Sequence, residues 1–224
     1  MCRFLIVKSE KLLKPWDFIF NFAEAAKKCC SYDGDWQGDG WGVSWLNEKN
    51  EWKLYKSLLP IWEDNNNFSL VPLTNLFVIH ARSASFEKDK NNIDLNQPYI
   101  NNKYAYVFNG LIKSIKLPFR IKGAIGAQKI WNILQQYLNE KQITPFLALN
   151  SLKTMLLKYA KEIQAANIAL INCQSISCLT IYNAHPSYYQ LKLYKDNDIF
   201  ILSSLEIKGF NFGSLEIGVY EFNF

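Results

Sequence analysis

The sequence predicts an α+β domain in which helices pack on antiparallel sheets. Predicted strands occupy both ends of the chain and predicted helices lie between them, an order typical of layered α+β folds. Short strand–turn–strand patterns recur, which favours antiparallel pairing. No repeat, low-complexity tract or linker divides the chain, so we expect residues 1–224 to form a single domain.

The first half of the chain is expected to hold one helix and four strands. Residues 16–30 carry apolar side chains at helical spacing, and Pro15 suits the first turn of that helix. The expected strands are residues 4–7, 43–46, 52–57 and 76–82. The last of them is an apolar run that would deliver His80 and Arg82 to the end of a buried strand. The polar segment 83–102 is expected to be largely loop.

The second half is expected to contain a hairpin, two helices and five further strands. Asn109-Gly110 separates the apolar runs 103–108 and 111–115, and this dipeptide is the strongest short signal for a hairpin turn. The helices are expected at residues 127–139 and 145–163. The further strands are expected at residues 167–172, 177–182, 188–194, 199–203 and 217–222. A turn at 196–198 would join the third of these strands to the fourth.

Charge and hydrophobicity exclude several classes of function. The net charge is +5, but the basic residues are spread out and no run of five marks a nucleic-acid-binding segment. No apolar run reaches the roughly 18 residues of a transmembrane helix, and the run after Met1 is too short for a signal peptide. Five cysteines without zinc-site spacing suit a reducing compartment. We therefore expect a cytoplasmic protein that binds neither membranes nor nucleic acid.

No metal and no cofactor are expected. The glycine-bearing loop 31–42 resembles a calcium loop over a few residues, but Gln37 stands where an acidic or amide ligand is usual. Ser44 stands where the closing glutamate belongs, so we exclude calcium. The remaining cysteines are interpreted as buried, small apolar side chains: Cys29, Cys30, Cys173 and Cys178.

The first four residues, Met1 to Phe4, offer a specific chemistry. If Met1 is removed, Cys2 carries both a thiol and a free α-amine, whose ordinary pKa of about 7.7–8.0 leaves part of it as an uncharged base near neutral pH. Nucleophile and base then share one residue. These residues alone favour the plainer interpretation, a cysteine without a chemical role, so the decision depends on the rest of the chain.

A series of short motifs resembles class II glutamine amidotransferase domains of the stand-alone type, which are N-terminal-nucleophile hydrolases. The motifs are Cys2, Asp39-Gly40-Trp41-Gly42, His80-Ala81-Arg82-Ser83-Ala84-Ser85, Asn96-Gln97-Pro98-Tyr99, Phe108-Asn109-Gly110 and Ile201-Leu202-Ser203-Ser204-Leu205-Glu206. They follow the order of that family over nearly the whole chain. The resemblance implies a four-layer α/β/β/α sandwich of two antiparallel sheets.

The resemblance also implies roles for individual residues. Cys2 would be the nucleophile and its α-amine the general base. The Asn109 side chain and the Gly110 backbone N–H would form the oxyanion hole, since a tetrahedral intermediate needs preorganised donors. Arg82 would bind the α-carboxylate of glutamine, because its planar fork suits a carboxylate. The implied activity is amide hydrolysis that releases ammonia through a thioester on Cys2.

The implied partners are a small-molecule amide, such as glutamine or an analogue, and a synthetase that accepts ammonia; a homodimer is also compatible with the sequence. Plainer interpretations stay open for each motif. Asn109-Gly110 is also a common hairpin turn, and Arg82 is also a usual salt-bridge partner. His80 is interpreted as a core histidine whose ring nitrogens are satisfied by hydrogen bonds, and no chemistry is assigned to it.

The sequence departs from the family at one position. Members carry an aspartate, which pairs with the α-ammonium of glutamine, at the start of the helix after the Asn-Gly segment. Here Gly126 takes that place and Gln128 replaces the following glutamate. We therefore expect a preference for amides that lack a free α-amine, unless an acidic residue such as Asp94 reaches the pocket. A γ-glutamyl-type amide hydrolase and a catalytically inactive binding module of the same fold remain alternatives.

Overall fold

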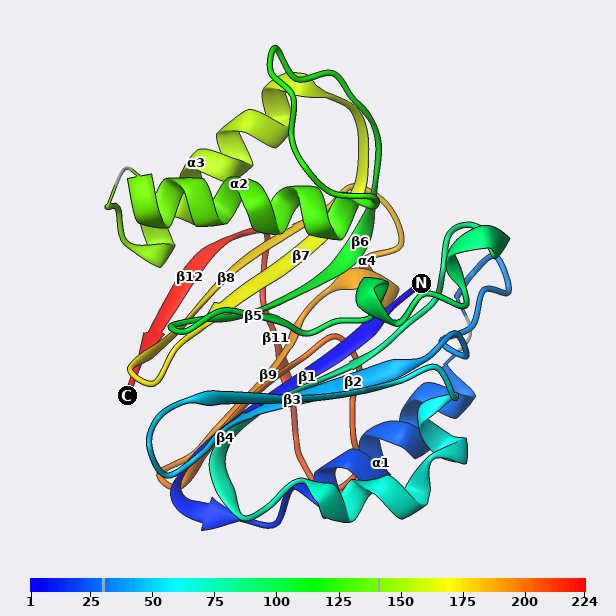
Figure 1. Ribbon diagram of the computed structural model, residues 1–224, viewed down its shortest axis with the longest axis vertical. Helices are drawn as coiled ribbons and strands as arrows, with labels where there is room; N and C mark the ends of the chain where they lie inside the picture. The colour runs from blue at the N-terminus through cyan, green and yellow to red at the C-terminus, as the bar shows by residue number, and fades with distance from the viewer. Residues whose placement is uncertain (30, 141) are drawn as a thin grey trace.

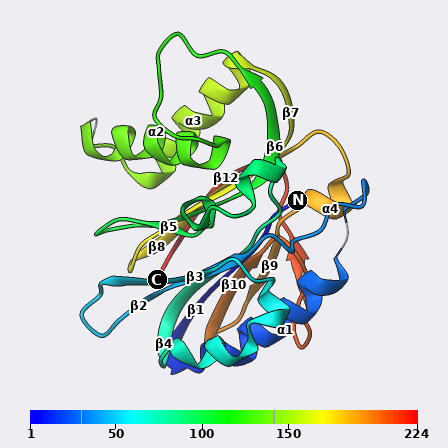
Figure 2. The ribbon, with the colours of Figure 1, turned by 45° about the vertical axis from the view of Figure 1, so that its right-hand side comes forward.

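The computed structural model describes residues 1–29, 31–140 and 142–224, and shows two antiparallel sheets packed face to face with helices on their outer faces (Figures 1 and 2). One sheet has seven strands in the order β11-β9-β10-β1-β4-β2-β3, and the other has five in the order β12-β8-β7-β6-β5. The layers therefore run helix, sheet, sheet, helix. This arrangement confirms the expected fold class.

The elements have the following bounds. The helices are α1 (Pro15–Lys28), α2 (Gly126–Glu140), α3 (Pro145–Tyr159) and the short α4 (Pro186–Tyr189). The seven-stranded sheet contains β1 (Arg3–Leu13), β2 (Trp41–Leu46), β3 (Trp52–Ser57), β4 (Thr74–Ala81), β9 (Lys192–Lys195), β10 (Ile199–Ser203) and β11 (Gly213–Ser214). The five-stranded sheet contains β5 (Tyr99–Ile100), β6 (Ala105–Ile115), β7 (Ala160–Ile171), β8 (Ser175–Tyr182) and β12 (Gly218–Asn223).

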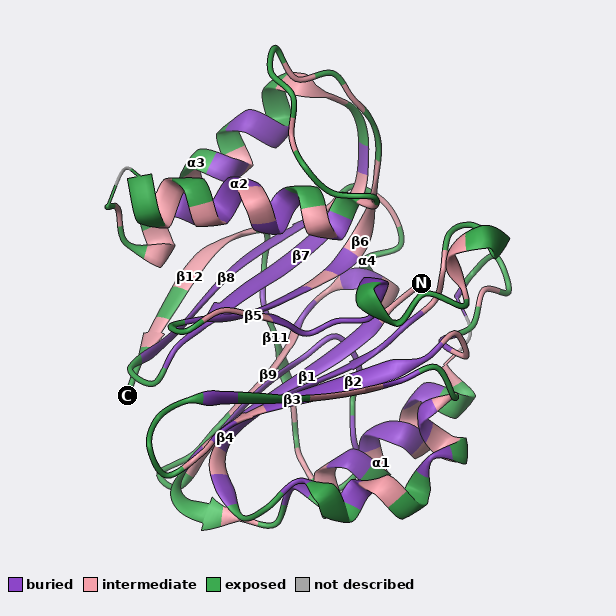
Figure 3. Ribbon diagram, viewed as in Figure 1, coloured by how far each residue is buried: buried purple, intermediate pink, exposed green. Residues whose placement is uncertain are grey.

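Strand β1 shows how the layers arise from the sequence. Successive side chains on a strand point to opposite faces. Leu5 and Val7 pack in the cluster that includes α1, whereas Phe4 and Ile6 pack in the cluster between the sheets. All four are fully buried, in line with the buried central strands of Figure 3. The apolar run expected at residues 4–7 is thus the core of a longer strand that pairs with β4 and β10.

The second sheet carries α2 and α3 on its outer face. Leu134 of α2 and Leu152 of α3 pack against Tyr106 and Ile168 of the sheet in one apolar cluster. Helix α2 agrees with the expectation. Helix α3 begins as expected at Pro145 but ends at Tyr159, so the extension to residue 163 was wrong. Residues 160–163 instead pair with β6, because long-range strand pairing overrides the helix propensity of Ala160, Lys161 and Glu162.

The hairpin expected at Asn109-Gly110 was wrong. Both residues lie inside β6, where Asn109 pairs with Asn167 and Gly110 with Ala166 of β7. Close packing rather than a turn accounts for the glycine, since a Cβ on Gly110 would lie 2.3 Å from the carbonyl oxygen of Ala165. The close approach of two backbones, not local turn chemistry, accounts for this dipeptide.

Two further expectations need correction. The strand expected at residues 188–194 is divided, because Pro186 opens the short helix α4 and β9 begins only at Lys192. The turn at 196–198 does join β9 to β10. Cys178 is buried as expected and Cys29 is partly exposed, but Cys173 is exposed because it lies in the turn between β7 and β8. Cys30 lies outside the described residues.

Most other expected elements are confirmed. Helix α1 and strands β2, β3, β4, β8, β10 and β12 lie where the pattern places them, within a few residues at each end. Segment 83–102 is mainly loop with short 3-10 turns.

Within the described part of the chain, no helix is both long and apolar enough to cross a membrane. The same residues contain no cluster of three histidine, cysteine or acidic side chains that could hold a metal ion.

Candidate active site

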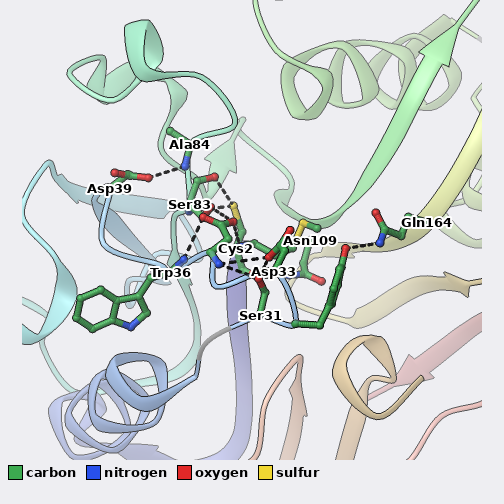
Figure 4. Close-up of polar contacts among 12 residues, drawn as sticks. Cys2, Ser31, Asp33, Trp36, Asp39, Ser83, Ala84, Asn109 and Gln164 are labelled. Carbon is green, nitrogen blue, oxygen red and sulfur yellow. Dashed lines mark hydrogen bonds and ion pairs between the residues drawn. The ribbon is translucent and has the colours of Figure 1, made fainter. Parts of the chain in front are cut away.

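Cys2 and Asn109 meet at one end of the space between the sheets. Cys2 lies two residues before Phe4 and four before Ile6, so by the alternation of side chains along a strand it belongs to the same face as these two residues, which face the other sheet. Asn109 lies two residues after Val107, so it belongs to the same face of β6 as Val107, which packs in the cluster between the sheets. The Asn109 Nδ2 donates a hydrogen bond to the carbonyl oxygen of Cys2 (Figure 4). Two residues 107 positions apart are therefore brought together by the packing of the sheets.

Asn109 is held in a buried network of polar groups. Its Oδ1 accepts a hydrogen bond from Asn167 Nδ2 at 3.4 Å. Asn167 in turn donates to the Tyr189 carbonyl at 2.6 Å and accepts from Thr180 Oγ1 at 2.7 Å. Because its oxygen is occupied by Asn167, the amide of Asn109 presents its N–H groups to Cys2. No role for Asn167 was expected from the sequence, although a single amide within the apolar run of β7 was a signal.

The thiol of Cys2 contacts the backbone of Ser83. Sγ accepts from the Ser83 N–H at 3.4 Å and lies 3.5 Å from the Ser83 carbonyl oxygen, to which it can donate. Burial raises the pKa of the thiol above its ordinary value, and the nearby terminal ammonium, the Ser83 N–H and Arg82 only partly oppose this effect. The thiol is therefore protonated near neutral pH, and its use as a nucleophile requires a base.

The α-ammonium of Met1 is bound by Asp35. The same carboxylate oxygen accepts a hydrogen bond from Ser83 Oγ, and the backbone of Ser83 contacts the Cys2 thiol. Partial burial raises the pKa of Asp35, but the hydrogen bonds from the ammonium and from Ser83 outweigh burial and lower the pKa overall. The Asp35 N–H donates to Ser31 Oγ at 3.0 Å, which fixes the loop. No role for Asp35 or Ser83 was expected from the sequence.

Arg82 is buried and anchors the loop that covers this end of the sheets. Its Nη1 donates to Asn96 Oδ1 at 2.9 Å and to the Asn92 carbonyl at 3.2 Å. Its Nη2 donates to the Asp89 carbonyl at 2.7 Å. These partners are neutral oxygen atoms rather than a carboxylate, so the salt-bridge interpretation does not describe this arginine. Arg82 lies close enough to Cys2 for its charge to lower the pKa of the thiol.

His80 is fully buried, as expected from the sequence, but neither ring nitrogen has a hydrogen-bond partner among the described residues, so the expectation of a satisfied histidine was wrong. Burial lowers its pKa to about 3, and the positive charges of Arg82 and Lys56 act in the same direction. The imidazole is therefore neutral at neutral pH. Its place on β4, opposite Phe4 of β1, belongs to the core between the sheets.

Gly126 and Asp94 lie apart from the contacts of the thiol. Gly126 is the exposed first residue of α2, and a Cβ there would have no atom within 4 Å. Asp94 lines a hollow of about 410 Å³ together with Lys56, Tyr99 and Gln128, and Cys2 is not among the residues that line it. Gln128 Nε2 donates to the Asp94 carbonyl at 3.4 Å. Neither position places a carboxylate at the nucleophile.

The structure is similar to known structures at low sequence identity. A glutamine aminotransferase class-II domain protein from Silicibacter pomeroyi matches with a TM-score of 0.58 and 13% identity, over 100% of this chain and 99% of that one. The glutamine phosphoribosylpyrophosphate amidotransferase from B. subtilis matches with a TM-score of 0.63 and 12% identity, over 99% of this chain and 49% of that one. This chain thus spans about half of the B. subtilis protein.

Comparison of the sequence alone gives no relative, since no protein-family model and no curated protein matches it. The likeness therefore concerns the fold. Two antiparallel sheets with flanking helices and a cysteine directly before β1 agree with the expectation from the motif series. The chain has the N-terminal-nucleophile hydrolase-like fold of class II glutamine amidotransferase domains.

Proposed function

We propose that this protein is a class II glutamine amidotransferase-like amide hydrolase, which releases ammonia from glutamine or a related carboxylate-bearing amide through a thioester on Cys2. The observation that carries the proposal is the meeting of Cys2 with the amide of Asn109 at one end of the two sheets. A nucleophile beside an oriented, buried N–H donor is the arrangement that acyl transfer needs. The shared fold supports the same reaction class.

The proposed reaction requires a chain that begins at Cys2. The free α-amine of Cys2 takes the thiol proton, and Sγ forms a bond to the amide carbon of the substrate. The negative charge on the former carbonyl oxygen is stabilised by Asn109 Nδ2 and the Gly110 N–H. The ammonium then gives its proton to the leaving nitrogen as the C–N bond breaks, which releases ammonia. Water hydrolyses the resulting thioester and restores the thiol.

Arg82 is proposed to bind the substrate carboxylate while it continues to hold the loop. A guanidinium has five N–H donors, and three of them are used in the hydrogen bonds to Asp89, Asn92 and Asn96. The Nε–H and the second Nη2–H are the donors assigned to the substrate. This dual use would make the position of the loop depend on the same side chain that selects the substrate.

Covalent labelling with an electrophilic glutamine analogue tests the proposal. With a substoichiometric amount of reagent, Cys2 should be alkylated before the other thiols, and the intact mass of protein from its own host should correspond to a chain that begins at Cys2. Peptide mass mapping locates the label, and Cys2→Ser provides the control. Cys173 is the demanding competitor because it is exposed. Preferential labelling of Cys173, or retention of Met1 in the host, would contradict the proposed reaction.

A further inference from the structure

We propose that Asp35 is the carboxylate that binds the α-ammonium of the substrate, so that free glutamine with an unmodified amine is the substrate class. This inference rests on the proposed function. It assigns to the loop after α1 the task that an aspartate at position 126 was expected to perform. It also reverses the expectation that amides without a free α-amine are preferred.

Asp35 already binds an α-ammonium in this structure. The terminal group of Met1 has the same chemistry as the amine of a free amino acid, and it forms an ion pair with Asp35. The Met1 side chain is only 13% exposed, so an entire amino-acid residue is accommodated there. The Met1 contact therefore shows how the α-ammonium of an amino acid can be bound near the thiol.

The Asp35 carboxylate is also linked to the nucleophile through Ser83. Asp35 accepts the Ser83 hydroxyl, and the backbone of Ser83 contacts Cys2 Sγ at 3.4 and 3.5 Å. Two contacts thus connect the ammonium site to the nucleophile. Arg82, the proposed partner of the substrate carboxylate, directly precedes Ser83 in the chain. The charges of Arg82 and Asp35, the groups that would recognise the two charged ends of an α-amino acid, both lie close enough to Cys2 to act on the pKa of its thiol.

The charges around Asp35 favour the same role. Among the described residues, the Met1 ammonium is the one cation within ion-pair distance of Asp35. In a chain that begins at Cys2, this pairing is lost, while the Ser83 hydroxyl and the Trp36 N–H still donate hydrogen bonds to the Asp35 carboxylate and favour its ionised form. The nearby Asp39 differs, because it accepts the Ala84 N–H at 2.8 Å and lies 3.7 Å from Lys90 Nζ. Asp35 is thus the carboxylate that a substrate ammonium would complement.

The α-amine of Cys2 is the competing occupant of this site. A carboxylate in contact with that amine would raise its pKa and hold it as an ammonium. An ammonium cannot accept the thiol proton, so this pairing would oppose the role of the amine as a base. The two occupants can therefore be distinguished. If Asp35 binds the substrate ammonium, the effect of substituting Asp35 depends on whether the substrate has an α-amine. If Asp35 binds the Cys2 amine, the effect is the same for every substrate.

The test compares glutamine with glutaramate, which has the same amide and carboxylate but no α-amine, using protein that begins at Cys2. Asp35→Asn should lower kcat/KM for glutamine by about 10- to 100-fold and leave glutaramate unchanged within about twofold. Asp33→Asn is the matched control, because its amide oxygen can still accept the Ser31 hydroxyl while one charge of the same loop is removed. An equal loss for both substrates, or no loss for either, would overturn the inference.

A binding measurement separates failure of this inference from failure of the proposed function. In a Cys2→Ala chain without Met1, calorimetry should show glutamine binding about 10- to 100-fold more tightly than glutaramate, and Asp35→Asn should abolish that difference. This result is independent of turnover. If the two ligands bind equally well, Asp35 does not select the ammonium, whether or not the wild-type protein hydrolyses an amide.

Discussion

Two groups of residues meet at the thiol, and they are held in different ways. Cys2 and Asn109 lie at the head of β1 and inside β6, where strand pairing and the buried Asn167 fix their positions. Asp35 and Arg82 belong to loops that side-chain hydrogen bonds hold in place. The strand residues are proposed to perform the chemistry and the loop residues to select the substrate. Sites on strands are positioned more precisely than sites on loops.

The largest expected effect is on the strand side of this comparison. Asn109→Ala should slow turnover by about 10²- to 10³-fold, the usual effect of losing one oxyanion donor. It should also lower stability by about 1–3 kcal/mol, because Asn167 loses a buried partner. The rate per folded molecule and the melting curve should be measured on the same preparation.

A matched control for this variant is Asn172→Ala. Asn172 holds the turn between β7 and β8 by accepting the Gln174 and Ser175 N–H groups at 2.8 Å. Its loss should reduce stability and leave the rate per folded molecule unchanged. If Asn109→Ala behaved in the same way, Asn109 would be a structural residue and the oxyanion assignment would fail.

The second expected effect is on the loop side. Arg82→Gln should raise the KM for glutamine by about 10- to 100-fold, because it removes a charged partner of the substrate carboxylate. Asn96→Ala provides the control, since it removes one anchor of the loop and keeps the guanidinium charge. Limited proteolysis of segment 83–98 should show a loosened loop in both variants. Equal KM values in the two variants would show that Arg82 anchors the loop and does not bind the substrate carboxylate.

Acid should weaken the strand region through His80. The pKa of His80 is about 3 in the folded protein and has an ordinary value of 6.5. Below pH 6.5 the unfolded chain therefore binds a proton that the folded chain does not, so stability falls with decreasing pH until the pH approaches 3. At pH 5 the loss attributable to this group is about 2 kcal/mol relative to pH 7.5.

Urea denaturation at pH 7.5 and pH 5 measures this loss. His80→Gln removes the titrating group, so its stability should vary less between the two pH values than that of the wild-type protein. Equal pH dependence in both proteins would show that His80 is not the group responsible.

The contrast between strand and loop also explains which features could be predicted from sequence. The run at residues 4–7 and the side-chain alternation around it were readable, because burial and strand period are local patterns. Asn109-Gly110 was misread as a turn, since its pairing partner lies in β7, far along the chain. Asp35 gave no signal of its role, because its contact with Ser83 joins residues 48 positions apart in two loops. Local rules describe strands better than they describe loops that are fixed by distant contacts.

The smallest expected effect comes from Gly126→Asp. The new side chain would stand on the exposed first residue of α2 with no atom near its Cβ, so it should not strain the fold. A negative charge at a helix N-terminus contributes about 0.3–1 kcal/mol, which for a chain of this size raises the Tm by about 1–3 °C. Because Asp35 is proposed to supply the ammonium-binding carboxylate, kcat/KM for glutamine should stay within about twofold of wild type. A large gain in kcat/KM for glutamine, without a gain for glutaramate, would show that the ammonium site lies at the start of α2 rather than in the loop after α1.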